Sequence, residues 1–414
     1  MLEKMKSAWR IPELRKKIIY TFGMLLLYRL LCCIPVPGVN IAAVSDAVKN
    51  FSVLDFMNMM TGGSFQNMTI MAMGITPYIN ASIILQLLTV AIPTLEKLAK
   101  EGPEGRKKIT EWTRYLTVAL AFIQAVGLVF AMRANSYGGI WYLVIGVSMA
   151  AGTSLAMWIG ERITENGIGN GISLLIMAGI VSNMFNWSRQ AVVGLIDGTV
   201  VIIAVLVVVL AFLVMIVAIT YVDMGERRIP VQYAKRMVGR KMYGGQSTHI
   251  PMKLNSTGVM PLIFGFAILQ FPATVFAFFP TSGINLWWQG FQSGVWYQVV
   301  LAVLIIAFTY FYTGITFNPA DISKNMQQNG GIIPGIRQGR ATTDYLARVS
   351  SRLTLFSALF LAVLATIPTI ITRLFGVSTP FAASSVLIAV SVGIETIRQI
   401  EAQMVMRHHK GFLG

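Results

Sequence analysis

The amino-acid sequence predicts an all-α integral membrane protein with ten transmembrane helices, and three observations support this fold class. The 414 residues are 55% hydrophobic and only 12% charged, whereas a soluble domain carries roughly 25% charged residues. Ten mostly apolar runs are long enough to cross the roughly 30 Å hydrocarbon core of a bilayer. Lysine and arginine are concentrated in alternate connections between these runs, which is typical of a multi-pass membrane protein.

The ten predicted spans divide evenly between two halves of the chain. They cover residues 18–36, 68–92, 114–132, 140–160, 169–185, 199–221, 257–280, 295–316, 348–371 and 381–400. Residues 1–198 therefore hold spans one to five, and residues 199–414 hold spans six to ten. Because five is an odd number, any structural repeat of the halves runs through the membrane in opposite directions, with the working site between them. This inverted repeat is inferred from topology, since the halves share no convincing sequence identity.

The distribution of basic residues predicts the orientation of the spans. Twenty-eight of the 33 lysines and arginines fall in the two termini and in alternate connections, and only four fall in the opposite connections. Cytoplasmic segments retain positive charge, so both termini are expected in the cytoplasm. The net charge of +16 favours anionic partners and anionic lipid headgroups.

The polar inventory excludes several kinds of chemistry. The two cysteines, Cys32 and Cys33, are adjacent and can hardly bridge to each other within a helix. The three histidines show no metal-ligand spacing, so we expect no metal site and no cofactor. The glycine-rich stretch at residues 167–171 resembles a phosphate loop but lacks the Lys-Ser/Thr that follows one. Any energy source is therefore expected outside this chain.

Charged residues inside the spans are almost absent. Arg29 is the one base deep in a span, and Glu395 lies near the cytoplasmic end of the last. Ion-coupled transporters keep titratable side chains at membrane depth, so an uncharged conduit fits the sequence better than a pump. Arg29 itself is more simply explained as a structural residue that snorkels or bonds backbone carbonyls.

Three segments outside the spans also bear on function. Residues 51–68 are moderately apolar, too short to span, and contain the breaker Gly62-Gly63. They fit either a helix folded back into the bundle from outside or an amphipathic helix on the outer interface. Two long cytoplasmic loops, at about 223–256 and 317–347, are rich in basic residues. Positive-inside topology explains any single one of these bases, but two such loops on one face indicate a docking surface for a large anionic partner.

These residues closely resemble the SecY family of protein-translocation channels. The resemblance covers essentially the whole chain in order. The matching stretches are IPVPG (34–38), GITPYINASIILQLL (74–88), EGPEGRKK (101–108), ITENGIGNGIS (163–173), ERRIP (226–230), YAKR (233–236), QSTHIPMK (246–253), FPAT (271–274), IPGIR (333–337) and RHHKGF (407–412).

The resemblance implies a central hourglass pore whose waist is a ring of aliphatic side chains. The family's ring corresponds to Ile79, Ile83, Ile176, Ile180, Ile263 and Ile388. An apolar constriction excludes water and ions and offers no fixed partner to a passing chain. Spacing alone would favour ordinary packing isoleucines, so this assignment depends on the matching motifs.

The resemblance also implies a plug that seals the idle pore and a lateral gate toward lipid. The plug corresponds to residues 54–67, with Leu54, Phe56, Met57, Met60, Gly62, Gly63 and Phe65 as its expected members. The segment is richer in methionine than is common in the family, and methionine adapts to irregular packing. The gate lies between spans two and three on one side and seven and eight on the other. Gln86, Gln124 and Gln270 are polar residues of those spans and could hydrogen-bond across the gate.

The two basic loops resemble the docking site for the SecA motor or the translating ribosome. The positions that match are Lys235, Arg236, Arg240, Lys241, Arg337 and Arg340. Gln338 stands where a proline is common, which leaves the conformation of that loop tip open. The resemblance implies SecE and SecG as helper subunits, signal-bearing polypeptides as substrates, and YidC and anionic lipids as further partners, in the bacterial cytoplasmic membrane.

The expected function is thus a passive, partner-driven polypeptide channel and not an enzyme. A small-solute secondary transporter has similar topology but lacks support from intramembrane charges. A membrane-embedded enzyme would need a Ser-His pair, paired aspartates or an H-E-x-x-H motif at membrane depth, and none is present.

Overall fold

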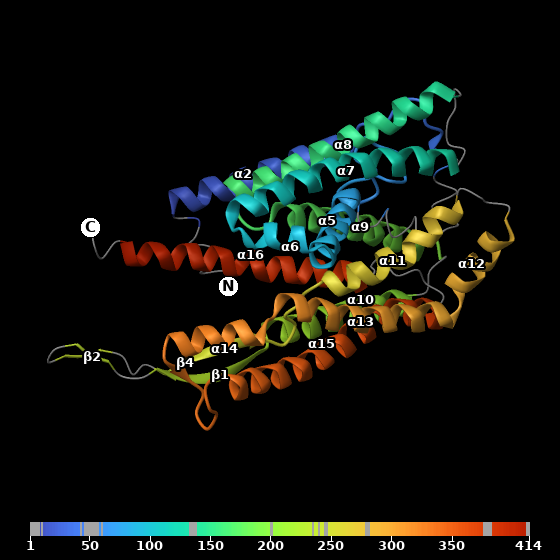
Figure 1. Ribbon diagram of the computed structural model, residues 1–414. Helices are drawn as coiled ribbons and strands as arrows, with labels where there is room; N and C mark the ends of the chain where they lie inside the picture. Colours follow the sequence, from blue (N-terminus) through green and yellow to red (C-terminus); the bar gives the residue numbers. More distant parts are fainter. Residues whose placement is uncertain are drawn as a thin grey trace. The chain divides into compact units, whose positions relative to one another are not determined.

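The computed structural model describes residues 9, 11–41, 44, 58, 61–131, 139–198, 202–233, 236–238, 241–243, 247–277, 282–375 and 383–410. These residues are mostly helical, as predicted (Figure 1). They form two compact units. Unit 1 comprises Met1–Phe212, Ala267–Gly294 and Pro368–Gly414, and unit 2 comprises Leu213–Phe266 and Val295–Ile367.

Unit 1 is a bundle of long helices. It contains α2 (Pro12–Leu31), α5 (Thr76–Ala91), α6 (Pro93–Lys100), α7 (Pro103–Ala131), α8 (Gly139–Asn166), α9 (Gly171–Ile196), α12 (Gly283–Ser293) and α16 (Ala383–Lys410). Helices α7 and α8 lie side by side, and α8 also packs on α2 and α9 (Figure 1). Helix α9 packs in turn on α16.

Unit 2 contains α13 (Val295–Thr316), α14 (Pro319–Gln328) and a small sheet. Three further helices, α10 (Ile202–Met224), α11 (Met260–Ala277) and α15 (Arg340–Phe375), contribute residues to both units. The sheet has the strand order β4-β1-β5, formed by Ser247–Lys253, Glu226–Tyr233 and Gly331–Ile332. A separate two-stranded ribbon pairs β2 (Arg236–Val238) with β3 (Lys241–Tyr243).

Six helices of the described residues are long and apolar enough to cross a membrane, or seven if the bent pair α5 and α6 forms one span. The three remaining predicted spans, at 18–36, 257–280 and 381–400, contain helices α2, α11 and α16, which do not meet that test within the described residues. The structure therefore supports a multi-pass membrane protein, and the count of ten spans stays a prediction.

The second predicted span, 68–92, is wrong at its beginning. Residues 61–75 form successive turns, and the helix begins only at Thr76. Gly74 has a φ of +52°, outside the helical region, and Pro77 in the first helical turn has no N–H to extend a helix backwards. The turns are hydrogen-bonded to residues 34–36. Val36 N donates to Met68 O at 2.9 Å, and Ile70 N donates to Ile34 O at 2.9 Å.

Glycines set the close packing of α8 against its neighbours. A Cβ added to Gly152 would lie 2.0 Å from the carbonyl oxygen of Ile70, and one added to Gly171 would lie 2.0 Å from that of Gly160. The glycine-rich stretch at 167–171 is therefore the tight turn between α8 and α9. Asn170 caps α9 there, because its Oδ1 accepts hydrogen bonds from the backbone N–H groups of Ile172 and Ser173.

Replacing Gly152 by valine is expected to destabilise the protein by about 1–3 kcal/mol or more, because the new methyl groups would overlap the backbone of residue 70. The midpoint of thermal aggregation in detergent measures this loss. Gly23→Val is the matched control, since Gly23 also lies within a helix but has no atom within 4 Å of an added Cβ. Equal midpoints for the two variants would contradict the close approach.

Candidate functional site

The five predicted ring isoleucines of unit 1 come from three helices. Ile79 and Ile83 lie on α5, Ile176 and Ile180 on α9, and Ile388 on α16. Spacing of four residues places each pair on one helix face. Ile83, Ile176, Ile180 and Ile388 are all at most 9% exposed, and Ile79 is half-buried.

The structure brings Ile79 and Ile176 together. Both line one small cavity, with room for about one water molecule, whose other walls come from α2, the turns at 61–75 and the start of α5. Helix α16, which carries Ile388, packs directly against α9. The sixth ring residue, Ile263, lies on α11 in unit 2 and is half-buried. Every ring side chain is a branched hydrocarbon, so the group contains no polar or titratable atom.

The described part of the predicted plug is anchored in the core of unit 1. Phe65 is fully buried in one cluster with Ala125, Ile145 and Met149 of α7 and α8. Asn58 holds the turn before it: Asn58 O accepts a hydrogen bond from Gly63 N at 2.9 Å. Leu54, Phe56, Met57 and Met60, which complete the predicted plug, lie outside the described residues.

Gly62 and Gly63 form a sharp turn immediately before this anchor. Their φ values are +65° and +87°, in the left-handed region that glycine adopts without strain. A Cβ added to Gly62 would lie 2.9 Å from the carbonyl oxygen of Gly179 on α9. The turn is therefore in direct contact with the helix that carries Ile176 and Ile180.

Arg29 of α2 reaches the same turn. One guanidinium nitrogen, Nη2, donates to Gly62 O at 3.2 Å and also to Ser182 Oγ on α9. The sequence alone favoured a structural residue that snorkels or bonds backbone carbonyls. The structure shows the carbonyl bond, and sequence reasoning could not identify either partner because both are distant along the chain.

The predicted gate glutamines are not drawn together by the bonds that the structure describes. Gln86 is exposed on α5 and donates from Nε2 to Ser82 Oγ on its own helix at 3.4 Å. Gln124 is half-buried on α7, which packs on α5. The backbone of Gln270 belongs to α11, but its side chain lies outside the described part. Hydrogen bonding across a gate stays a prediction.

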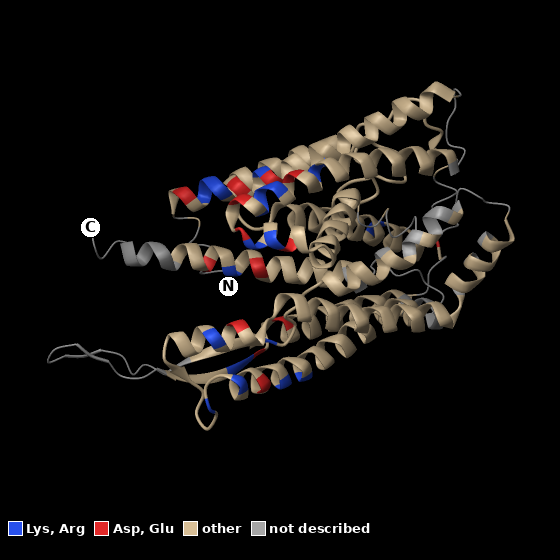
Figure 2. Cartoon of the chain, in the orientation of Figure 1, with Lys and Arg blue, Asp and Glu red and all other residues tan. Residues whose placement is uncertain are grey.

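The two predicted docking loops meet in the sheet of unit 2. Strands β1 and β4 come from the first loop, and β5 comes from the second, with Gln232 opposite Ile332. A buried cluster of Ile229, Val231, Met326 and Leu346 lies beneath the sheet. Within unit 2, charged side chains gather on the sheet, α14 and the start of α15, whereas α13 has none (Figure 2).

Arg337 is exposed on the connection from β5 to α15, and Arg340 is exposed at the first residue of α15. Gln338, whose effect on this loop tip the sequence left open, donates from Nε2 to Gly331 O at 3.1 Å and so ties the tip to β5. Ser323 Oγ donates to Gly339 O at 2.9 Å and ties it to α14. The loop tip is therefore a built surface that presents both arginines to solvent.

The other predicted docking residues are described only in part. Arg236 and Lys241 lie on β2 and β3, the ribbon within the first loop, and their side chains lie outside the described residues. Lys235 and Arg240 themselves fall outside the described part of the chain. The structure therefore describes only the backbone of Arg236 and Lys241, on a ribbon that lies between β1 and β4 in the sequence.

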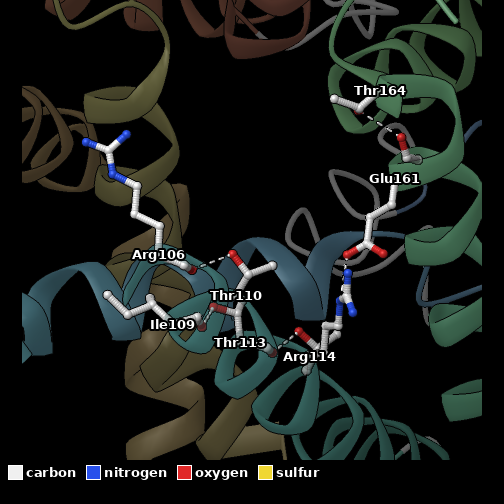
Figure 3. Close-up of polar contacts among 9 residues, drawn as sticks. Arg106, Ile109, Thr110, Thr113, Arg114, Glu161 and Thr164 are labelled. Atoms are coloured by element: carbon white, nitrogen blue, oxygen red, sulfur yellow. Dashed lines mark hydrogen bonds and ion pairs between the residues drawn. The ribbon is translucent and has the colours of Figure 1, made fainter. Parts of the chain in front are cut away.

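An ion pair joins α7 to α8 in unit 1. Arg114 Nε lies 2.8 Å from Glu161 Oε1, and Figure 3 shows the two side chains facing each other while the Arg106 side chain points away. Both partners are partly exposed, so the pair stabilises the fold by no more than about 1 kcal/mol. On nearby α6, a hydrogen bond from Lys100 lowers the pKa of the Glu96 carboxyl. Both acids, Glu161 and Glu96, are thus paired with a base.

Among the described residues, no group of three or more histidine, cysteine, aspartate or glutamate side chains could hold a metal ion. Within unit 1, the helices α5 and α9 bring aliphatic side chains together beside the irregular segment at residues 61–75. The long apolar helices define the class as a multi-pass membrane protein, and the pore ring itself stays a prediction.

Similarity to known proteins identifies the family of this chain. The family model described as SecY matches residues 69–397. The protein translocase subunit SecY of Streptomyces scabiei is 42% identical over 442 residues, covering 100% of both chains. This chain therefore belongs to the SecY family, which is a family of translocation channels and not of enzymes.

Solved channel structures share the fold. One, described as showing that the plug domain of SecY stabilises the closed state of the translocation channel and maintains a membrane seal, has a TM-score of 0.69 at 21% identity and covers 94% of this chain and 92% of its own. Another, Sec61 in the canine ribosome-channel complex from the endoplasmic reticulum, has a TM-score of 0.66 at 19% identity and covers 94% and 93%. The chain is thus a protein-conducting channel subunit.

Proposed function

We propose that this chain passes unfolded secretory proteins across the bacterial cytoplasmic membrane and releases membrane segments sideways into lipid. Both termini face the cytoplasm, and transport is driven by a SecA motor or a translating ribosome. SecE and SecG serve as helper subunits, and YidC receives membrane segments. The anionic lipids of the inner leaflet interact with the basic cytoplasmic face.

Membership of the SecY family is the observation that carries this proposal, and the aliphatic side chains assigned to the ring support it. Ile79, Ile83, Ile176, Ile180 and Ile388 present only hydrocarbon from α5, α9 and α16. Such a waist offers no hydrogen-bond partner to a passing backbone, so a chain of any sequence can slide through it. The same surface does not solvate an ion, so a narrow ring resists ion flow. Ile263 of α11 is the sixth proposed member of the ring.

The plug and the gate extend the same proposal. Residues 54–67 seal the idle pore, a role supported by the stated plug function in a structurally similar SecY. The turn at Gly62 and Gly63 gives the segment a place to bend between its anchor at Phe65 and the rest of the plug. Gln86, Gln124 and Gln270 belong to the spans that part when a membrane segment leaves.

The docking surface is the sheet face of unit 2 and its adjoining loop. Its proposed members are Lys235, Arg236, Arg240, Lys241, Arg337 and Arg340. A ribosome would be held through the phosphates of its RNA, with steep dependence on salt. A similar solved structure is a ribosome-channel complex, which supports a ribosome as one partner, and a protein motor would meet the same bases with acidic side chains.

A crosslink between substrate and ring tests the function. Cys32 and Cys33 are removed, one cysteine replaces Ile263, and a stalled secretory precursor carries a single cysteine in mid-chain. A disulfide is expected only when motor and ATP are both present, because the precursor reaches the waist only when it is driven there. Electrophoresis without reducing agent measures the crosslinked fraction.

A cysteine at Ile203, which is 63% exposed on α10 and predicted to face lipid, is the matched control and should not crosslink. Engagement of the precursor without any crosslink at position 263 would show that the ring assignment is wrong. Uptake that needs an ion gradient but no motor would instead favour a secondary transporter.

A further inference from the structure

Arg29 joins three parts of unit 1 at one point. It lies in the last turn of α2, its Nη2 donates to Gly62 O at 3.2 Å, and the same nitrogen donates to Ser182 Oγ on α9. Ser182 follows the ring residue Ile180 by two positions on that helix. One guanidinium therefore links α2, the turn at residues 61–64 and the helix that lines the proposed waist.

Gly62 is packed so closely against Arg29 and Gly179 that it leaves no room for a side chain. A Cβ added to Gly62 would lie 2.8 Å from Arg29 Nη1 and 3.1 Å from Gly179 Cα. The turn thus lies between the arginine on one side and a glycine of α9 on the other. Because both glycines lack side chains, the Gly62 carbonyl can approach the guanidinium directly.

We infer that Arg29 is a positioning residue that clamps the turn at 61–64 onto α9 while the channel is idle. This inference rests on the proposed function, because it treats that turn as the base of the plug. Arg29 does not contact the moving polypeptide in this arrangement. It acts through the turn, by raising the free energy of every state in which Gly62 has left α9.

The chemistry of arginine suits a reversible clamp. A hydrogen bond from a charged donor is stronger than one between neutral groups, and partial burial strengthens it further. If the turn leaves α9, the buried charge loses its carbonyl partner and must find another in an environment poor in water. The second nitrogen, Nη1, is buried without a hydrogen-bond partner among the described residues. The Gly62 carbonyl and Ser182 are therefore the described partners of Nη2, and Nη1 offers no second hold on the turn.

The test uses the complete channel complex in vesicles that contain a fluorescent potassium reporter. Arg29→Gln is expected to raise potassium leak through the idle channel about tenfold, the population shift that corresponds to losing one charge-assisted bond. Ser182→Ala should raise the leak less, because the bond to Gly62 O remains. Arg29→Lys should fall between wild type and Arg29→Gln, since one ammonium cannot reach as far as the planar fork.

Lys16→Gln is the matched control. Lys16 is an exposed base on the same helix, and its loss removes equal charge without touching the turn, so the leak should stay at the wild-type level. The double variant of Arg29→Gln with Ser182→Ala should leak no more than Arg29→Gln alone, because Arg29→Gln already removes the contact with Ser182. Additive leaks would show that the two residues act separately and would overturn the clamp.

Leak and transport are measured on the same vesicles, so two failures can be distinguished. If the wild-type complex imports no precursor with motor and ATP, the proposed function is wrong. If the wild-type complex imports precursor but the folded Arg29→Gln complex leaks no more than wild type, only the clamp is wrong. If Arg29→Gln does not fold, the leak of Ser182→Ala decides, and a wild-type value would reject the clamp.

Discussion

Replacing Arg337 by glutamate is expected to reduce motor-driven polypeptide transport by at least about tenfold. A charge reversal at a docking surface replaces attraction by like-charge repulsion, which costs on the order of 1.4 kcal/mol or more. Arg337 is exposed on a tip that Gln338 and Ser323 hold in place. Its side chain forms no part of the core, so the substitution should leave the fold intact. The rate of precursor import into vesicles measures the effect.

Two controls accompany this prediction. Arg337→Lys keeps the charge and should retain most of the transport, although a lysine cannot form a bidentate pair. Arg189→Glu changes an exposed base on the predicted outer side and should have no effect on import. Normal import by Arg337→Glu would show that Arg337 does not belong to the docking surface. Loss of import in both Arg337→Glu and Arg189→Glu would indicate a general effect of lost positive charge.

Replacing Ile176 and Ile180 together by serine is expected to raise potassium leak through the idle channel at least tenfold. The two side chains are 9% and 3% exposed, one turn apart on α9. Serine removes most of the hydrocarbon and adds a hydroxyl, so water can enter a waist that was previously apolar. Each hydroxyl can also bond to the carbonyl four residues earlier, which limits the cost to the helix.

Val181→Ser is the matched control for the ring. Val181 directly follows the ring residue Ile180 and is 53% exposed, and the same chemical change there should leave the leak at its wild-type level. A double serine variant that is folded, imports precursor and remains sealed would show that these isoleucines pack the helices and do not form the waist.

The fold class and the family could be predicted from the sequence because both depend on signals spread along the whole chain. Runs of apolar residues and the distribution of arginine and lysine record the membrane environment directly. Matching motifs in order then identified the family, and each of the helices that carry Ile79, Ile176 and Ile388 overlaps a predicted span.

The errors and omissions have local physical causes. Residues 68–75 are as apolar as a span, so hydropathy extended the second span through them, although Gly74 and Pro77 prevent a helix there. The bonds from Arg29 to Gly62 and Ser182 join positions 33 and 153 residues apart. Hydrogen bonds over such distances leave no periodicity in a single sequence, so only coordinates reveal them.

The same limit applies to the join between the two docking loops. Strand β5 is only two residues long, too short for any pattern of alternation to indicate it. Its pairing with β1 depends on a partner about a hundred residues earlier in the chain. The basic composition of the loops predicted a shared face, but composition could not predict that they share a sheet.

That shared sheet has a mechanical consequence. Strand β1 begins two residues after α10 ends, β4 leads within a few residues into α11, and β5 leads into α15. The backbone hydrogen bonds of β4-β1-β5 therefore connect the adjoining ends of these three long helices through one sheet. A force applied at either loop would be transmitted through the sheet to all three helices. A motor docked on this sheet, as proposed, would therefore move the three helices together instead of bending a single loop.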